Sequence, residues 1–244
     1  MQLNKRQKIR KTLIYISFFL FPITIFYLSP ALPFVGLFKG IINGSLIVFG
    51  LLFLFSLFFG RAYCSWVCPG AGASEICSSI LPKKTAKAHW LKWFVWIPWV
   101  SLFIVLLILF GNYKSVDFFM AIPKGISILN PEAVVIYYII LSIMVILSYT
   151  ADNRGFCHYV CWMSPFMIIG NKIRYIIKNP SLHLEAESEK CVSCHQCNKA
   201  CQMSIDVNKM VKDSNFNNSD CILCGLCIDN CSEHIIKYSF KRTK

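Results

Sequence analysis

The sequence predicts an all-α membrane bundle of four transmembrane helices, built as a duplicated two-helix hairpin, followed by a small C-terminal α+β domain. Three observations lead to this fold class: long apolar segments, a cysteine motif that occurs twice among them, and eight closely spaced cysteines near the C-terminus. The composition agrees, because 56% of the residues are hydrophobic and only 15% are charged, against about 25% charged in an ordinary soluble domain. The lipid bilayer is therefore the first partner that we expect.

Four apolar segments are long enough to cross a bilayer, which needs about 20 helical residues. They cover residues 13–28, 37–59, 93–110 and 133–149. The first two segments form one hairpin and the last two form a second. We expect four transmembrane helices.

Basic residues lie before the first span and between the second and the third, whereas the other two loops are poor in cations. Because cytoplasmic loops carry the excess of lysine and arginine, we expect a multi-pass protein of the cytoplasmic membrane with its N-terminus and its C-terminal domain in the cytoplasm. This placement also explains the net charge of +13, and we expect no nucleic-acid partner. The basic residues are Lys5, Arg6, Lys8, Arg10, Lys11, Arg61, Lys83, Lys84, Lys87 and Lys92.

The membrane half contains an internal repeat. The second span ends in R-A-Y-C-S-W-V-C at residues 61–68, and the fourth ends in R-G-F-C-H-Y-V-C at residues 154–161. Both follow a hairpin and both fall at the same membrane edge. We expect two pseudo-symmetric halves that bring the two C-x3-C loops together, since repeats of this kind often frame a site at their interface.

The four cysteines of this repeat have three interpretations. On a helix, C-x3-C places both thiols on one face, so two such pairs can supply four ligands to one metal or to a third iron–sulfur cluster. They can also form a redox-active dithiol or a partner-docking site, or only pack. The residues are Cys64, Cys68, Cys157 and Cys161.

Other polar groups surround these cysteines. Arg61 and Arg154 precede the two pairs, where they either stabilise thiolates or an anionic cluster or contact lipid phosphate. His158 is expected to be a hydrogen-bonded surface group. Cys77 is expected to be a small buried apolar residue.

The eight C-terminal cysteines form two runs of C-x2-C-x2-C-x3-C, the spacing of a bacterial two-cluster ferredoxin, in which the fourth cysteine of each run ligates the other cluster. Zinc sites favour C-x2-C pairs with a longer spacer, and disulfides need an oxidising compartment. We therefore expect two [4Fe–4S] clusters. Their ligands are Cys191, Cys194, Cys197 and Cys231 for the first cluster, and Cys221, Cys224, Cys227 and Cys201 for the second.

The expected organisation has three parts: a transmembrane domain at residues 1–161, an interfacial helix and linker at 162–188, and a two-cluster ferredoxin domain at 189–244. Within the middle part, residues 162–177 are expected to lie on the inner membrane surface and the polar stretch 179–190 to be a linker. Because about 50 residues are too few for a large core, an apolar shell is expected to shield the clusters, made of Ile205, Val207, Ile222, Leu223, Ile235 and Ile236.

Together these motifs resemble the membrane-bound polyferredoxin family, which includes the ferredoxin subunit of the quinol-oxidising module of periplasmic nitrate reductase and the core of the nitrous-oxide-reductase regulator. The resemblance covers nearly the whole chain and includes C-x3-C-P at residues 64–69 and the stretch C-Q-M-S-I-D-V at 201–207. There are departures, because Trp162, Gln202 and Ser232 stand where the family usually has proline.

The resemblance implies single-electron transfer at the cytoplasmic membrane face, between the clusters and a quinone-type carrier or a redox partner protein. No residue constellation indicates substrate chemistry, so we expect a non-catalytic electron-transfer subunit of an oxidoreductase system. The alternative function is an assembly, maturation or redox-sensing factor for a partner metalloenzyme.

Overall fold

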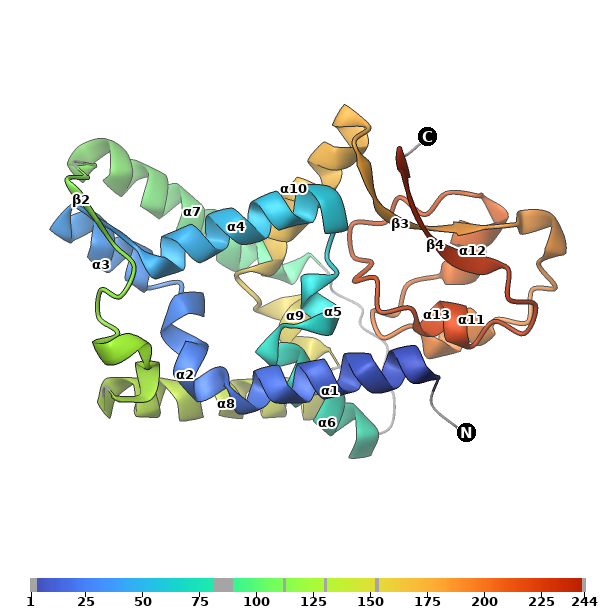
Figure 1. The fold of residues 1–244 in the computed structure, drawn as a ribbon, viewed down its shortest axis with the longest axis horizontal. Helices are drawn as coiled ribbons and strands as arrows, with labels where there is room; N and C mark the ends of the chain where they lie inside the picture. Colours follow the sequence, from blue (N-terminus) through green and yellow to red (C-terminus); the bar gives the residue numbers. More distant parts are fainter. Residues whose placement is uncertain (1–3, 81–89, 112, 130, 152–153, 243–244) are drawn as a thin grey trace.

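The computed structural model describes residues 4–80, 90–111, 113–129, 131–151 and 154–242. Three of the basic residues used for the orientation, Lys83, Lys84 and Lys87, lie outside the described residues. A helical bundle forms one end of the molecule and the cysteine-rich C-terminal segment forms the other, with the short helices α5 and α9 between them (Figure 1).

The bundle contains helices of very different length. Two short strands, β1 (Ile41–Asn43) and β2 (Ser115–Asp117), pair in parallel at the end far from the C-terminal segment (Figure 1). The helices are α1 (Lys5–Phe19), α2 (Phe21–Thr24), α3 (Leu32–Lys39), α4 (Gly44–Phe59), α5 (Tyr63–Trp66), α6 (Pro69–Ile80), α7 (Leu91–Phe110), α8 (Pro131–Thr150), α9 (Gly155–Tyr159) and α10 (Ser164–Ile177). Three 3₁₀ turns join them, at Ile25–Leu28, Pro123–Gly125 and Ser127–Leu129.

Two of the four expected spans are continuous helices long and apolar enough to cross a bilayer, namely α7 and α8. The first span is bent by 58° where α1 meets the segment that follows Phe19, so it counts as a third only if the bent pair is one span. The second is interrupted, because Gly40 adopts a left-handed conformation (φ 66°) that ends α3. Asn43 then caps α4 by accepting a hydrogen bond from the Leu46 N–H, which leaves a helix of 16 residues.

The two repeats exchange helices. Helix α10, which follows the second cysteine loop, packs against α4 of the first repeat, and α6 packs against α8 of the second. Close approach between α4 and α10 is possible because Gly170 faces Ser56 without a side chain of its own. Met167 and Ile168 of α10 are buried, so α10 is a packed helix of the bundle; its expected position on the inner membrane surface stays a prediction.

The C-terminal segment is built around an antiparallel pair of strands, β3 (Pro180–Ala186) and β4 (Ile236–Arg242), in register from Pro180 opposite Arg242 to Ala186 opposite Ile236. The stretch 179–190, expected to be a linker, therefore holds a strand. Five of the six residues of the expected apolar shell are buried and Ile205 is partly buried. The remaining elements are a 3₁₀ turn at Ser188–Lys190 and the helices α11 (Gln196–Ala200), α12 (Val207–Lys212) and α13 (Leu226–Asp229).

The contact between α4 and α10 leads to a prediction for Gly170→Ala. A Cβ at this position would lie 1.8 Å from Ser56 Oγ and 3.0 Å from the Phe53 carbonyl oxygen, so the helices must separate, at a cost of about 1–3 kcal/mol. We expect a lower unfolding midpoint by circular dichroism in detergent. The control is Gly50→Ala on α4, where a Cβ meets nothing within 4 Å. Equal midpoints for the two variants would contradict the close packing.

Candidate functional site

The eight C-terminal cysteines line two separate pockets. The grouping is the one that the spacing predicts, with the fourth cysteine of each run beside the first three of the other. Cys201, Cys221, Cys224 and Cys227 line one pocket, called here the inner pocket, and Cys191, Cys194, Cys197 and Cys231 line the other, the outer pocket. Four cysteine sulfurs around a common space are the donor set that a [4Fe–4S] cluster requires; ligation itself stays a prediction.

The two runs share an unusual backbone conformation. Positive φ angles occur at equivalent positions, at Ser193 and Leu223 before the second cysteine and at His195 and Gly225 after it. A bulky residue such as Leu223 rarely adopts this conformation, with a φ of 53° here. Such strain persists only where the surroundings impose it, and here it curls both loops around their pockets.

The pockets differ in exposure. The inner pocket is closed by apolar side chains such as Met203, Val207 and Ile222, all buried. In the outer pocket Cys194 is exposed, as is the neighbouring Val192. A group in the inner pocket is therefore shielded from water, while one in the outer pocket reaches the surface.

The two C-x3-C loops have the same local geometry. The N–H of Cys68 donates to the Tyr63 carbonyl, and the N–H of Cys161 donates to the Phe156 carbonyl, each at 2.9 Å. Helices α5 and α9 end before the second cysteine of their pair. The prediction of one helical face for both thiols is therefore wrong, because each short helix ends in a wider turn, in which the second cysteine bonds to the carbonyl five residues before it.

This structure also brings the C-x3-C thiols together, all of them buried. Cys68, Cys157 and Cys161 line one pocket with Met144 and Met163. Cys64 lies against a third methionine, with its Sγ 3.5 Å from Met167 Sδ. Within the part of the chain that the structure describes, no three His, Cys, Asp or Glu side chains lie close enough together to hold a single metal ion.

Burial raises the pKa of three of these thiols, those of Cys64, Cys68 and Cys161. Desolvation, together with the neighbouring Cys157 and Cys64, raises the pKa of Cys161 to about 12, and burial also raises the pKa of Cys68. In the absence of a ligand these three thiols are therefore protonated at neutral pH, and a metal centre must displace their protons to bind. Free thiolate chemistry is disfavoured here.

Arg61 and Arg154 are buried, at 1% and 2% exposure, so the alternative that they contact lipid phosphate is wrong. Each reaches across to the other repeat, where Arg61 donates to Ser164 Oγ at 2.6 Å and Arg154 to the Cys64 carbonyl at 3.4 Å. Each also reaches the C-terminal segment. Arg61 pairs with Asp220 at 3.2 Å, next to Cys221.

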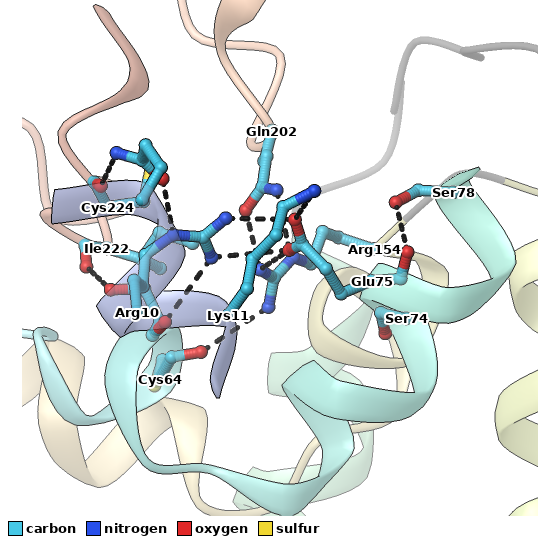
Figure 2. A network of polar contacts seen from close by, with 12 residues as sticks. Arg10, Lys11, Cys64, Ser74, Glu75, Ser78, Arg154, Gln202, Ile222 and Cys224 are labelled. Carbon is cyan, nitrogen blue, oxygen red and sulfur yellow. Dashed lines mark hydrogen bonds and ion pairs between the residues drawn. The ribbon is translucent and has the colours of Figure 1, made fainter. Parts of the chain in front are cut away.

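Glu75 of α6 is the centre of the polar network drawn in Figure 2. Its carboxylate accepts from Arg10 at 2.9 and 3.2 Å and from Arg154 at 3.4 Å. Gln202, directly after Cys201, accepts from Arg154 at 2.5 Å and donates to Glu75 at 2.8 Å. Although burial opposes it, the contacts with Arg154, Arg10 and Gln202 lower the pKa of Glu75 to about 2. The carboxylate is therefore ionised at neutral pH.

Direct hydrogen bonds join the first C-x3-C loop to the wall of the inner pocket. Ser65 Oγ donates to the Ile222 carbonyl at 2.6 Å and Trp66 Nε1 to the Leu223 carbonyl at 3.1 Å. From α1, Gln7 donates to the Cys224 carbonyl at 3.0 Å. The inner pocket is thus the one that faces the C-x3-C thiols.

His158 and Cys77 differ in burial from what the sequence predicts. His158 is fully buried, with its ring against Tyr159, so the expectation of a surface histidine is wrong. Cys77 is only partly buried on α6. Sequence reasoning also missed Glu75, Asp220 and Gln202; the one signal was the absence of the usual proline at Gln202.

Comparisons with known proteins agree with these cysteine groups. A family model described as a 4Fe-4S binding domain matches twice, at residues 44–87 and 134–179, each match containing one C-x3-C pair. A model described as a 4Fe-4S dicluster domain matches residues 190–236. The fold and the cysteine groups thus define the class: an iron–sulfur protein with apolar helices that can span a membrane, for which these domains support a role in electron transfer.

Three curated relatives are distant. Two proteins of Methanocaldococcus jannaschii, named "Uncharacterized protein MJ0750" and "Uncharacterized protein MJ0749", are 25% and 23% identical over 96% and 97% of this chain, and the matches cover 94% and 89% of their own lengths. The Escherichia coli protein named "Putative electron transport protein YccM" is 21% identical over 72% of this chain and 50% of its own. No solved structure matches the chain.

Gln202 should matter for the docking of the C-terminal segment. In Gln202→Ala, Glu75 and Arg154 each lose a buried hydrogen bond, and an unsatisfied buried group costs about 1–3 kcal/mol. We expect faster hydrogen–deuterium exchange in residues 221–227 by mass spectrometry. Ser232→Ala is the control, because Ser232 follows the fourth cysteine of the other run and is exposed. Exchange unchanged from the native protein would show that the Gln202 contacts do not hold this interface.

Proposed function

We propose that this chain is a membrane-anchored iron–sulfur protein of the polyferredoxin type, which passes single electrons between cytoplasmic-face [4Fe–4S] clusters and a quinone-type carrier or a membrane redox partner. The observation that carries the proposal is the division of eight cysteines into two pockets of four, with hydrogen bonds from Ser65 and Trp66 of the first C-x3-C loop to the wall of the inner pocket. The electron-transport name of the distant Escherichia coli relative supports the same role.

The residues present fit such clusters. The inner and outer pockets each offer four thiols, and the strained loops at Leu223 and Ser193 hold them around a common space. When bound, a [4Fe–4S] cluster supplies reversible one-electron chemistry. The chain's own contribution is to exclude water from the inner pocket through buried apolar residues and to fix the loops through Gln7, Ser65 and Trp66.

For the C-x3-C thiols we propose a third iron–sulfur cluster, held by Cys64, Cys68, Cys157 and Cys161. Three observations support this choice over a thiol-redox pair or simple packing. The segments that carry these cysteines match a 4Fe-4S binding domain, the four thiols converge from both repeats, and two buried arginines lie beside them. A cluster also overcomes the raised thiol pKa values, because metal binding displaces the protons.

Iron content tests the third cluster. Protein purified without oxygen should hold about twelve iron atoms per chain, against about eight for two clusters. The double variant Cys64→Ser with Cys157→Ser should lose about four of them, while the EPR signal of the reduced dicluster segment remains. Cys77→Ser is the matched control, because this cysteine belongs to none of the three groups, and it should retain all the iron. Iron that does not change in the double variant would exclude the third cluster.

The electron-transfer role has its own test. After anaerobic reduction with dithionite and removal of the excess, a short-chain quinone analogue should reoxidise the clusters within seconds, as followed by their visible absorbance. The control is the same protein mixed with the corresponding quinol, which can accept no electrons from it. Clusters that stay reduced in the presence of the quinone would exclude direct coupling to a quinone.

A further inference from the structure

The junction between the C-x3-C loops and the inner pocket contains a layer of buried cations. Four side chains form it, each at 2% exposure or less: Arg10, Arg61, Lys92 and Arg154. We call these four residues the cation layer. They come from four separate parts of the chain, namely α1, the loop after α4, the start of α7 and the loop before α9, so the tertiary fold gathers them.

The carboxylates in contact with this layer do not balance it. Glu75 contacts Arg10 and Arg154, and Asp220 contacts Arg61 and Lys92. Among the described residues of the junction, four buried cations thus share two carboxylates. Lys11, partly exposed, adds a further positive charge 3.6 Å from Glu75. Unbalanced buried charge is costly, which indicates that anionic groups lie against the layer when the protein is complete.

The thiols are the groups in position to supply that negative charge. On one side, Arg154 donates to the carbonyl of Cys64 at 3.4 Å, and the buried Arg61 lies three residues before Cys64 in the same loop. On the other side, Arg61 pairs with Asp220 directly before Cys221, and Arg10 donates to Gln7, which in turn donates to the Cys224 carbonyl of the inner pocket. A cluster held by four thiolates is a polyanion, and nearby charge is one of the factors that set its reduction potential. The layer therefore lies between two sites that each become anionic when they are ligated.

We propose that the cation layer is the shared counter-charge of the C-x3-C site and the inner pocket, and that it sets the reduction potential of a centre bound in the inner pocket. The proposal rests on the proposed function, since it needs bound clusters. Positive charge stabilises the more negative, reduced form of a cluster. Removing a cation must then lower the potential, and removing the carboxylate that partly neutralises the layer must raise it.

The test is a redox titration of the reduced dicluster EPR signal in the full-length protein, with dithionite as reductant. Glu75→Gln should shift the midpoint to a more positive potential and Arg154→Gln to a more negative one. At a fixed potential, the ratio of reduced to oxidised clusters should change by about fivefold or more in opposite directions. A merely structural role predicts the same direction for both variants, because both break the same network.

The controls separate charge from structure. Glu187→Gln makes the same chemical change in the C-terminal segment, but this side chain is 51% exposed and pairs with Lys190 at the surface, so it should shift the midpoint little. Arg154→Lys keeps the charge, so its midpoint should stay near the native potential. This variant also tests the role of the charge if Arg154→Gln fails to assemble.

Three results overturn the inference alone: a negative shift in Glu75→Gln, a shift no larger than that of Glu187→Gln, or an Arg154→Lys midpoint that leaves the native value as far as Arg154→Gln does. If the native protein shows no reducible iron–sulfur signal, the proposed function itself fails. The two failures are therefore distinguishable in one titration series.

Discussion

The burial of charge at the junction of the bundle and the C-terminal segment is the constraint on which the rest of the structure depends. A buried cation that loses its partner costs several kcal/mol, so Arg10, Arg154 and Glu75 tolerate little displacement. Arg10 lies on α1, Arg154 in the loop before α9, and Glu75 on α6, while Gln202 belongs to the C-terminal segment. Four separate parts of the chain must therefore take fixed positions relative to one another. Apolar packing alone permits the C-terminal segment to slide against the bundle, whereas this polar network does not.

The duplication explains how one short motif builds a shared site. Each repeat contributes an apolar helix, a cysteine loop and a following helix, and the following helices pack on the opposite repeats. The arginines also connect the two repeats, because Arg61 donates to Ser164 and Arg154 donates to the Cys64 carbonyl. The two loops are thereby cross-connected, and neither cysteine pair can move independently of the other. The symmetry ends at the carboxylates, because Glu75 and Asp220 come from unrelated positions.

The sequence could predict the local features and not the long-range ones. The two cysteine groups follow from spacing, because three ligands of each lie within seven residues. The second span was overestimated, since hydropathy ignores the left-handed turn at Gly40. Strand β3 was missed because its partner β4 begins 50 residues after Ala186. The positive-inside count treated Arg10 and Arg61 as loop charges, but their partners lie 65 and 159 residues away.

Gln202 shows how a departure from a motif carries structural information. Proline at this position has no side-chain donor or acceptor, whereas glutamine supplies both and closes a ring with Arg154 and Glu75. The equivalent residue of the other run, Ser232, is exposed and takes no part in this network. The residues after the fourth cysteine of the two runs thus differ in their contacts, because only Gln202 contacts the bundle. That asymmetry orients the C-terminal segment, so that the inner pocket faces the C-x3-C thiols and the outer pocket, with the exposed Cys194, faces away from them.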